Sequence, residues 1–499
     1  MSDTIDTAAA FTITSDTTGD VWELVVGLEV HCELATATKL FCSCPNVFGD
    51  EPNTNVCPVC LGLPGSLPVL NRQAVELAMR IGRALHCDVH PSVFARKNYF
   101  YPDMPKDYQV SQYDQPINAD GHLDLADGST VGIERAHIEE DTGKNTHAGG
   151  GGRIHGADYS LVDYNRAGVP LVEIVGRPDI RSPEQAKAYV DELRAILLAT
   201  GASDAKMEEG SMRVDANVSV RHVGDPVLGT RCEIKNLNSL RSLGRAIEYE
   251  AKRQVQLLEA GDSVKQETRH WDEDAGRTRS GRSKEEAEDY RYFQEPDLVP
   301  LDPGADWVAA VDEALPTLPA ARRAALAEAA GVAPTDRGVV IAVDRGLDGL
   351  AVAAIAAGGD AARVLNHVEH NLAADGASSL DPAALAELVR METGGQLTAT
   401  QAKQVLADMV DSGRAPADIA AERGFEAMDT SELAGVLDGI IAGNADAWAD
   451  YVAADDGDKR LKKLKGFFTG EVMKATRGQA DGKEVNRLLD ERRASGAGG

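Results

Sequence analysis

Two close pairs of cysteines most restrict how the N-terminal part of this chain can fold. They form a C-x-C and a C-x-x-C motif with twelve residues between them, at Cys42, Cys44, Cys57 and Cys60. Four thiolates on two tight turns suit a tetrahedral Zn²⁺ ion, which stabilises loops that cannot bury a core of their own. Disulfides and free core cysteines are the alternatives. We expect structural zinc, and a zinc hydrolase is excluded because four thiolates leave no coordination position open for water.

The composition is typical of a protein from a reducing compartment. The chain has 499 residues, of which 43 % are hydrophobic and seven are cysteines. This length suggests roughly two to four domains. The first residues contain neither the basic segment nor the apolar run of a signal peptide, and no stretch reaches the roughly 20 apolar residues that span a bilayer. We therefore expect a cytoplasmic protein without membrane partners, with a disordered tail over residues 1–20.

The charge is strongly acidic overall but basic in one place. A formal net charge of −29 argues against nucleic acid as a partner, because phosphates attract lysine and arginine. Between residues 459 and 479, however, seven basic residues stand against the single acid Glu471, and two phenylalanines lie among them. This cluster indicates either a phosphate-binding surface or the solvated face of a helix, and charge alone favours neither.

Local patterns divide the chain into three parts and predict an α+β protein. Short alternating apolar runs mix with helical patterns over residues 21–300, which predicts a cradle domain built on a β-sheet. The run DLVPLDPG at residues 297–304 is typical of a domain boundary, because it combines prolines with glycine. Beyond it, alanine-rich helical patterns predict an all-helical domain over residues 301–405 and a small helical tail domain over residues 406–499.

A predicted β-strand carries the first candidate site. In VWELVVGLEVHCEL, residues 21–34, every even-numbered position is apolar, so one face of the strand is expected to be buried. Glu29 and His31 then project side by side from the other face. A carboxylate and an imidazole in this arrangement can share a cation, and a hard ion such as Mg²⁺ is favoured where carboxylates dominate. An ordinary polar strand face is the alternative.

Further carboxylates follow in the same region. RAHIEEDTGK at residues 135–144 contains three acids, a histidine and a lysine. Glu173 stands among apolar neighbours in a strand-like segment at residues 160–175, where an acid is costly unless it is paired or bound to a metal. Residues 211–220 alternate as well, with Arg213 and Asp215 on the polar side. These acids support a cation site, and Glu173 is its strongest candidate.

Seven motifs together resemble one known family. They are GLEVH (27–31), ARKNYFYPDMPKDYQVSQYDQPI (95–117), HIEEDTGK (137–144), DYNRAGVPLVEIV (163–175), MEEGSMRVDANVSV (207–220), EIKNLNS (233–239) and EDYRYFQEPDLVPL (288–301). In this order they closely resemble the B subunit of the aspartyl/glutamyl-tRNA amidotransferases, the GatB family. The resemblance is dense over residues 21–301 and weaker towards the C-terminus. One departure is Gln294, where the family usually has proline.

The resemblance implies an ATP-dependent carbon–nitrogen ligase. Members of the family use ATP to phosphorylate the side-chain carboxyl of Asp-tRNA(Asn) or Glu-tRNA(Gln), and ammonia then attacks the acyl phosphate. A companion amidase, the A subunit, frees this ammonia from glutamine, and the small C subunit fastens the pair. The implied partners are these two subunits and misacylated tRNA, which the tail domain over residues 406–499 is expected to bind. The implied cofactors are ATP, Mg²⁺ and a structural Zn²⁺.

The same resemblance implies the site residues. The family's Mg²⁺ ligands fall on Glu29, His31, Glu140 and Glu173. Lys144 and Arg166, in motifs beside these acids, are the expected phosphate contacts. Such a set suits phosphoryl transfer. This reaction needs a cation to bridge phosphate oxygens and further positive charge to neutralise the negative charge that develops on the phosphoryl group. The four paired cysteines match positions that zinc-bearing members keep, so their zinc is expected to be structural.

Two other functions share some of these features. The archaeal E-type relative has the same cradle but carries a large inserted domain, for which this chain has no room between the cradle motifs and the tail. A zinc-ribbon RNA-binding scaffold without catalysis would not need an acid such as Glu173 inside an apolar strand.

Overall fold

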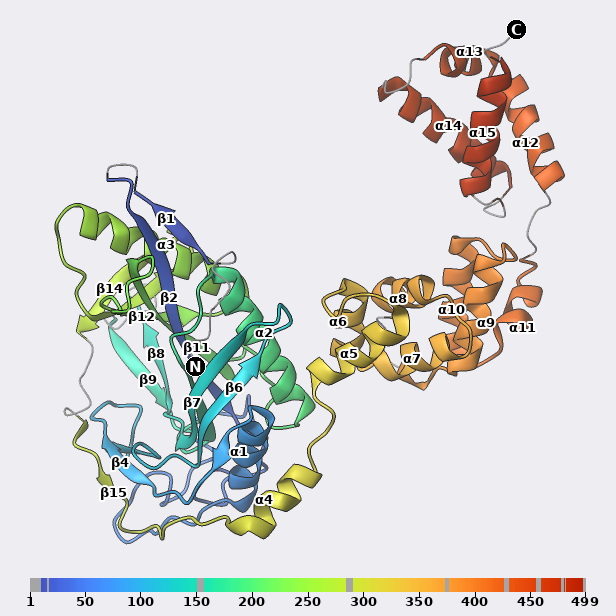
Figure 1. Cartoon of the computed structure of the whole chain (residues 1–499). Coiled ribbons are helices and arrows are strands. Elements are labelled where there is room, and N and C mark those ends of the chain that lie inside the picture. The colour runs from blue at the N-terminus through green and yellow to red at the C-terminus, as the bar shows by residue number, and fades with distance from the viewer. Residues whose placement is uncertain are drawn as a thin grey trace. The chain divides into compact units, whose positions relative to one another are not determined.

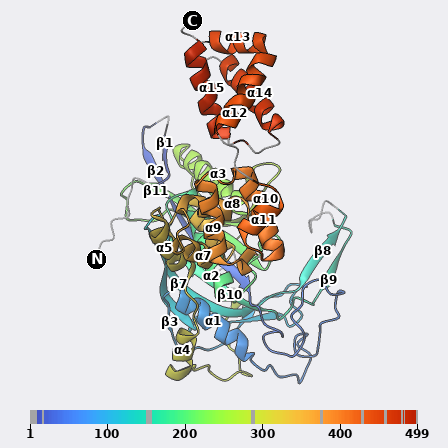
Figure 2. The same cartoon turned by 90° about the vertical axis from the view of Figure 1, so that its right-hand side faces the viewer.

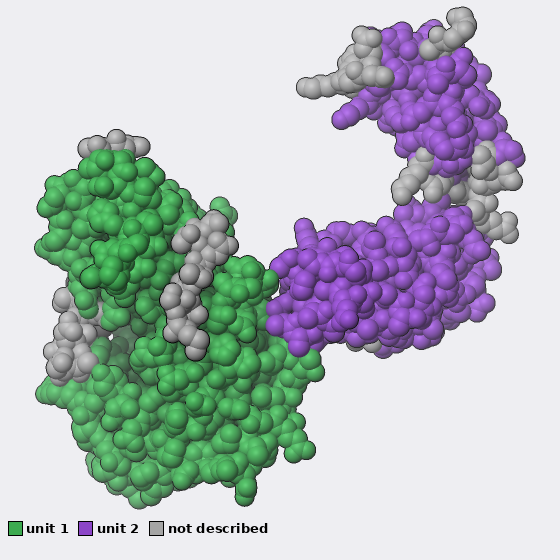
Figure 3. Space-filling view, viewed as in Figure 1, with its two compact units in different colours: residues 1–319 green, residues 320–499 purple. Residues whose placement is uncertain are grey.

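The chain divides into two compact units, residues 1–319 and 320–499, in a computed structural model (Figure 3). The structure describes residues 10–15, 18–149, 157–283, 290–372, 377–425, 430–454, 459–476, 480 and 482–496. None of the helices in these ranges is long and apolar enough to cross a membrane. A large sheet in the first unit and helices in the second confirm the predicted α+β class.

A large sheet forms the centre of the first unit (Figure 1). Its strands follow the order β14-β13-β12-β11-β2-β10-β7-β5-β4-β15, with β1 paired to β2 and β6 paired to β7. The four central strands are antiparallel to their neighbours and are β11 (Met212–His222), β2 (Val21–Glu33), β10 (Pro170–Gly176) and β7 (Thr130–Glu140). The others are β1 (Thr12–Thr14), β3 (Asp88–Val89), β4 (Ala95–Asn98), β5 (Tyr108–Ser111), β6 (Asn118–Asp124), β12 (Cys232–Leu237), β13 (Glu267–Asp272), β14 (Arg277–Ser283) and β15 (Phe293–Gln294).

A two-stranded ribbon stands apart from this sheet. It consists of β8 (Lys144–Ala148) and β9 (Tyr159–Asp163), which pair only with each other among the described strands. Figure 2 shows the ribbon extending away from the large sheet. The expected phosphate contact Lys144 therefore lies at the base of this ribbon, directly after the turn that follows β7.

The predicted alternation of β2 is confirmed. Its even-numbered side chains are buried in the hydrophobic core, among them Leu24, Val26, Leu28 and Val30. Helices α1 (Arg72–Ala84), α2 (Pro183–Ala199) and α3 (Leu240–Glu259) pack on this face and, with the neighbouring strands, supply further residues of the core. Each helix begins at a side-chain cap that accepts backbone hydrogen bonds, Asn71, Ser182 and Ser239 respectively. On the opposite face of β2, Glu29, His31 and Glu33 remain partly accessible, whereas Glu23 and Val25 are buried as well.

The first unit continues past the boundary expected near residue 300. Helix α4 (Gly304–Glu313) packs on α1, where the guanidinium of Arg72 lies 4.0 Å from the ring centre of Trp307. In the same contact, Nε of Arg83 lies 2.7 Å from Oδ1 of Asp312. Contacts between two helices, rather than the proline-containing run, therefore determine where this unit ends.

The N-terminal tail is partly structured. Residues 12–14 form β1, which pairs with β2 so that Ile13 lies opposite Trp22. The backbone N–H of Phe11 also donates to the carbonyl of Arg181 over 2.8 Å. The expectation of a disordered tail over residues 1–20 is thus wrong for this segment, because its backbone completes the edge of β2. Residues 1–9 and 16–17 lie outside the described part of the chain.

The second unit contains helices around two separate hydrophobic cores. The first core draws on α5 (Pro319–Ala330), α6 (Arg337–Asp344), α7 (Asp348–Ala356), α8 (Ala361–His370), α9 (Pro382–Thr393), α10 (Ala399–Ser412) and α11 (Pro416–Glu422). The second draws on α12 (Thr430–Gly443), α13 (Ala445–Ala453), α14 (Lys459–Ala475) and α15 (Gly482–Gly496). The boundary expected between residues 405 and 406 falls inside α10, whose Val405, Leu406 and Met409 are buried in the first core.

Gly82 allows helix α1 to approach the sheet closely. A Cβ atom at this position would lie 2.0 Å from Oδ1 of Asn118 on β6. The buried Asn118 amide donates to the carbonyls of Ala78 over 3.0 Å and Ala136 over 2.9 Å, so it joins α1 to β7. The amide cannot move aside without taking its own buried N–H groups away from these acceptors.

We expect Gly82→Ala to lower the free energy of unfolding of the first unit by about 2 kcal/mol or more. Alanine normally stabilises a helix interior by about 1 kcal/mol over glycine, but each buried amide N–H of Asn118 that loses its acceptor costs about 1–3 kcal/mol. Urea unfolding of the full chain measures the change. The control is Gly439→Ala in α12, where a Cβ would meet no atom within 4 Å, and it should not destabilise the second unit. Unchanged unfolding of Gly82→Ala would contradict the tight fit at Asn118.

Candidate active site

Strand β10 places Glu173 between two histidines. Its antiparallel register pairs Glu173 with His31 of β2 on one side and with His137 of β7 on the other. The next residue on the same face of β10, Leu171, pairs with Glu139. Directly paired residues of neighbouring strands project from the same face of a sheet. The face of the sheet opposite the core therefore gathers imidazoles and carboxylates from three strands.

Four of these side chains form one cluster, which we call the His–Glu cluster: His31, His137, Glu139 and Glu173. Nε2 of His137 lies 3.3 Å from Oε2 of Glu173 and 3.8 Å from Oε2 of Glu139. Nε2 of His31 lies 3.7 Å from Oε2 of Glu173 and 3.8 Å from Oε1 of Glu139. One ligand atom each from His31, Glu139 and Glu173 lies within 4.8 Å of the others. Such separations suit nitrogen and oxygen atoms that surround one small cation.

Burial and charge act in opposite directions in this cluster. Burial alone would lower the pKa of His137, but the charges and hydrogen bonds of Glu173 and Glu139 raise it to about 9. Burial would likewise raise the pKa of Glu173, but the charges of His137 and His31 hold it well below its ordinary value. The carboxylate of Glu173 is therefore ionised at neutral pH, and it attracts positive charge into the cluster.

Of the four expected Mg²⁺ ligands, two lie in the His–Glu cluster. These are His31 and Glu173. Glu29 lies on the same strand face as His31, and its Oε1 accepts a hydrogen bond from Nδ2 of Asn217 over 2.8 Å. Glu29 is therefore a neighbour of the cluster with a protein partner of its own.

Glu140 lies apart from the cluster, and Glu139 stands where Glu140 was expected. The carboxylate of Glu140 forms an ion pair with Lys106 and accepts a hydrogen bond from the backbone N–H of Val110 over 2.9 Å. The reason is the twofold period of a strand: β7 runs through to Glu140, so Glu139 shares the face of His137 and Glu140 points to the other. Counting in steps of two from His137 could have found Glu139 in the sequence.

The two expected phosphate contacts line one cavity of about 710 Å³. Lys144 and Arg166 share this cavity with Glu33, which lies two residues beyond His31 on β2, and with Ser211. Burial and the charge of neighbouring Asp141 raise the pKa of Glu33 to about 8. The guanidinium of Arg166 is held in place by the carbonyls of Thr142 and Gly143, to which it donates over 2.9 and 3.0 Å. Two basic side chains thus line this cavity together with several carboxylates, and Glu33 connects the cavity to the strand that carries His31.

The four paired cysteines converge as expected. Their sulfur atoms all lie within 4.8 Å of one another, which is close enough to hold a metal ion: Cys42, Cys44, Cys57 and Cys60. A hydrogen bond from Cys42 lowers the pKa of Cys60 to about 5, and the charge of Lys39 contributes less. Lys39 is itself fully buried and donates to the carbonyl of Tyr164 over 3.2 Å. No sequence pattern predicted that Lys39 would be buried. Its ammonium group places positive charge beside the thiols.

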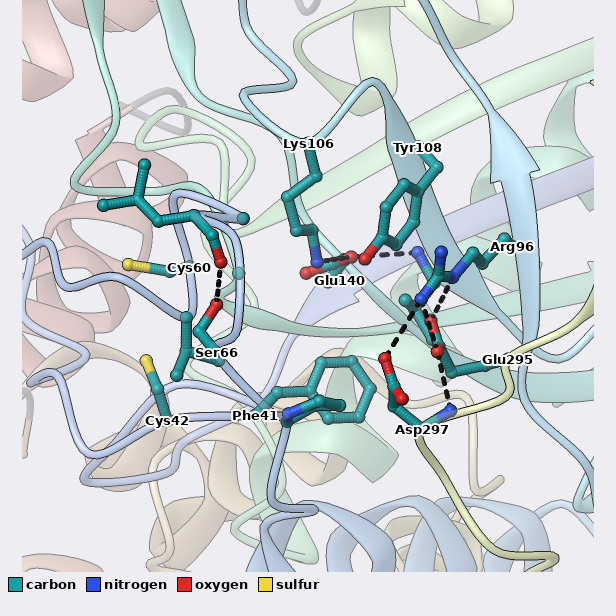
Figure 4. A pocket seen from close by; sticks show the side chains of 16 residues that line it. Phe41, Cys42, Cys60, Ser66, Arg96, Lys106, Tyr108, Glu140, Glu295 and Asp297 are labelled. Carbon is teal, nitrogen blue, oxygen red and sulfur yellow. Dashed lines mark hydrogen bonds and ion pairs between the residues drawn. The ribbon is translucent and has the colours of Figure 1, made fainter.

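A second cavity, of about 250 Å³, lies between the cysteines and Glu140 (Figure 4). Cys42, Cys60 and Phe41 form part of its lining, as do Lys106 and Glu140. In the same lining, Arg96 donates to both carboxylate oxygens of Glu295 over 2.6 and 2.8 Å, which is a bidentate ion pair. The motif at residues 95–117 therefore supplies pocket residues. The distant partner of Arg96, Glu295, becomes evident only in the fold.

Two models of known protein families match this chain. The model described as GatB/GatE catalytic domain matches residues 24–333, and the model described as GatB domain matches residues 348–492. The chain belongs to the GatB family. The resemblance inferred from seven motifs is thereby confirmed, and the catalytic-domain match contains the His–Glu cluster, both cavities and the four cysteines.

Relatives extend the GatB match to nearly the whole chain. Proteins named as the B subunit of aspartyl/glutamyl-tRNA(Asn/Gln) amidotransferase include one from Moorella thermoacetica, which is 48 % identical over 94 % of this chain and 99 % of its own. Another, from Frankia casuarinae, is 50 % identical over 94 % of this chain and 95 % of its own. A third, from Salinispora tropica, is 50 % identical over 94 % and 96 %. This GatB-family chain therefore spans nearly the full length of these relatives.

Proposed function

We propose that this chain is the B subunit of a tRNA-dependent amidotransferase, an ATP-dependent ligase. In the proposed reaction, ATP phosphorylates the side-chain carboxyl of Asp-tRNA(Asn) or Glu-tRNA(Gln), and ammonia then displaces the phosphate to give Asn-tRNA(Asn) or Gln-tRNA(Gln). The observation that carries the proposal is the His–Glu cluster beside a cavity lined by Lys144 and Arg166. Phosphoryl transfer needs this combination of a cation site and fixed positive charge.

The donor atoms of the His–Glu cluster fit a divalent cation. Glu139 and Glu173 offer hard carboxylate oxygens and His31 offers one imidazole nitrogen, with Glu29 on the same face. Mg²⁺ held by these residues would act as a Lewis acid that offsets negative charge on the transferred phosphoryl group. Lys144 and Arg166 would contact the phosphates from the adjoining cavity. The ligand set expected from sequence differs from this one in naming Glu140 in place of Glu139.

Partner molecules follow from the proposed reaction. The relatives are each named as one subunit of an enzyme, which supports an assembly of several subunits. We place in it an amidase, the A subunit, which releases ammonia from glutamine, and the small C subunit, which fastens the pair. The acceptor substrate is misacylated tRNA, and the compartment is the cytoplasm, where tRNA is aminoacylated and used.

For the cysteine cluster we propose a structural Zn²⁺. Four sulfur ligands favour zinc, and a closed four-thiolate site has no position for substrate. The loop between β2 and α1, residues 34–71, contains no helix or longer strand of its own, so a metal would hold it in place. A zinc ion with four thiolates carries excess negative charge, which the ammonium group of Lys39 would offset.

We expect Cys57→Ala to lose the one zinc per chain that the wild-type protein contains. Losing a structural zinc site destabilises its loop, so proteolysis within residues 34–71 should become faster. The side chains of the His–Glu cluster are unaltered by this substitution. Metal analysis by mass spectrometry, together with limited proteolysis, measures both effects. The matched control is Cys87→Ala, which removes a buried cysteine far from the cluster in sequence and should keep its zinc. Full zinc content in Cys57→Ala would rule out this site.

A zinc-dependent RNA-binding scaffold without catalysis is the second candidate function. Its support is the cysteine cluster, which needs no enzymatic role. Against it stand two carboxylates that are only 5 % and 15 % exposed, those of Glu139 and Glu173, facing two imidazoles across three strands. Burial of such charges is costly, and a scaffold would gain nothing from it. We therefore favour the ligase.

Paired glutamine variants distinguish the two proposed ligand sets. We expect Glu139→Gln to lower ATP-dependent amidation about 100-fold or more, because losing a metal ligand removes several kcal/mol of transition-state stabilisation. Glu140→Gln, one residue along the strand, should retain the activation step. The assay uses the assembled complex with ammonium chloride as nitrogen source, and glutaminase activity of the partner serves as the control for assembly. The reverse pattern would restore Glu140 as the ligand, and full activity of both variants would refute the cluster as the active site.

Helix α14 combines both interpretations of the basic cluster. Arg460 and Lys465 are paired within the protein, with Asp450 and Asp490 at 2.7 Å each. Lys462 and Lys463 are exposed on the same helix, while Phe468 is buried in the core below. Arg477 lies outside the described residues. We propose that the exposed lysines of this helix contact phosphates of the tRNA.

We expect Lys462→Glu to weaken tRNA binding and to reduce its dependence on salt. Each phosphate contact that is lost removes nearly one from the slope of log affinity against log salt. Filter binding of tRNA to the complex at several salt concentrations gives that slope. Lys403→Glu, an equal charge change at an exposed position of α10, is the control. Identical slopes for the two variants would show that α14 is only a solvated helix face.

A further inference from the structure

Asp141 lies at a junction of two arginines that come from distant parts of the chain. Its Oδ2 accepts a hydrogen bond from Nη2 of Arg213 over 2.6 Å, and the same oxygen lies 3.4 Å from Nε of Arg166. The Asp141 side chain is only 3 % exposed, whereas about a third of each arginine side chain remains accessible, 35 % for Arg213 and 33 % for Arg166. One buried carboxylate oxygen thus orients two partly open guanidinium groups.

The position of Asp141 is set by its backbone. The residue directly follows β7, and its N–H donates to the carbonyl of Val169 over 2.8 Å, while its carbonyl accepts from the N–H of Gly168 over 3.0 Å. Its other carboxylate oxygen accepts a hydrogen bond from the N–H of Thr142 over 2.8 Å. With both oxygens engaged, the carboxylate cannot rotate freely, so it holds the guanidinium of Arg213 in one place.

Arg213 has donor capacity that the described residues do not use. A guanidinium carries five N–H donors, and only Nη2 of Arg213 has an assigned hydrogen bond, to Asp141. Its Nε is buried and finds no acceptor in the described part of the chain. An unsatisfied buried donor is costly unless another group completes it. The donors on the accessible end of the guanidinium, rather than the buried Nε, remain available to a ligand that accepts hydrogen bonds and is attracted by positive charge.

The location of Arg213 identifies the class of this ligand. On the sheet it pairs directly with His31, so it adjoins the His–Glu cluster. Its partner across Asp141, Arg166, lines the 710 Å³ cavity together with Lys144. An anion between the two guanidinium groups that Asp141 holds would lie next to a cation at the cluster; Arg166 borders the cavity, whereas Arg213 is not part of its lining. Phosphate oxygens match the fork of arginine donors better than a single point charge does.

We propose that Arg213 and Arg166, with Asp141 as their positioning residue, form an anion site that binds phosphate oxygens of the nucleotide. This rests on the proposed function, since it assigns the nucleotide phosphates to one end of the proposed active site. Arg213 contacts the ligand, and Asp141 acts only through the arginines. A purely structural ion-pair network is the competing explanation, and it requires no response to ATP.

The test measures Michaelis constants of the assembled complex with ammonium chloride as nitrogen source. Arg213→Met should raise the KM for ATP about 10- to 100-fold, the equivalent of losing hydrogen bonds to a charged group, and should leave the KM for aminoacyl-tRNA within about twofold. Arg213→Lys should recover part of the loss, because it keeps the charge but not the fork. Asp141→Asn should shift the KM for ATP in the same direction, by less.

The matched control is Arg221→Met. Arg221 lies on the same strand, β11, but at its other end. It is also held by an acid, with its Nε 2.6 Å from Oε1 of Glu23. It should change neither constant. An unchanged KM for ATP in folded Arg213→Met would overturn the anion site, and a rise confined to the KM for aminoacyl-tRNA would do the same. If Arg213→Met does not fold, an unchanged KM for ATP in both Arg213→Lys and Asp141→Asn would overturn it.

Failure of the proposed function is a separate outcome. If the wild-type complex shows no ATP-dependent amidation, the ligase assignment fails. Calorimetric binding of ADP to wild type and Arg213→Met then tests the anion site alone: weaker binding by the variant supports it, and equal binding overturns it.

Discussion

A buried carboxylate in the middle of an apolar strand is the constraint on which the candidate site depends. Burial of Glu173 is tolerable only where positive charge meets it, and both neighbouring strands supply a histidine at the paired position. A slip of one residue in either register would turn the acid towards the hydrophobic core. The same register that completes the core thus assembles the His–Glu cluster, so packing and chemistry are stabilised together.

The cluster and the cysteines are held in place by different means. Every member of the His–Glu cluster lies on a central strand, where ladder hydrogen bonds and a packed core limit movement. The cysteine loop has no such support, because its backbone contains hardly any regular structure. The proposed zinc on four converging sulfurs, with the buried ammonium of Lys39 beside them, would give that loop the rigidity that the sheet gives the cluster.

Pairing of buried charges also explains the separation of Glu139 from Glu140. Two adjacent carboxylates on opposite faces of β7 need two different partners. Glu139 meets His31 and His137, while Glu140 meets Lys106 and a backbone N–H. The next residue, Asp141, meets two arginines. Three consecutive acids are thereby neutralised in three directions, which divides one acidic motif between the cluster, the small cavity and the anion site.

The sequence by itself determined the features that depend on neighbouring residues in the chain. The twofold period of residues 21–34 separated the buried face of β2 from Glu29 and His31, and cysteine spacing identified the four sulfurs that converge. An apolar setting marked Glu173, and composition marked the change from sheet to helices. Seven motifs together identified the family.

Only the tertiary structure decided the features that depend on pairing between distant segments. Whether Glu139 or Glu140 faces His31 depends on where β7 ends and on its pairing with β10, about 35 residues further along the chain. The same holds for β1 at the edge of β2, for α4 against α1, and for α10 within the first helical core. Local periodicity specifies which face of a segment is buried, but it contains no information about the partner. Strand register and helix packing, which minimise unpaired charge and exposed apolar surface over the whole domain, supply that information.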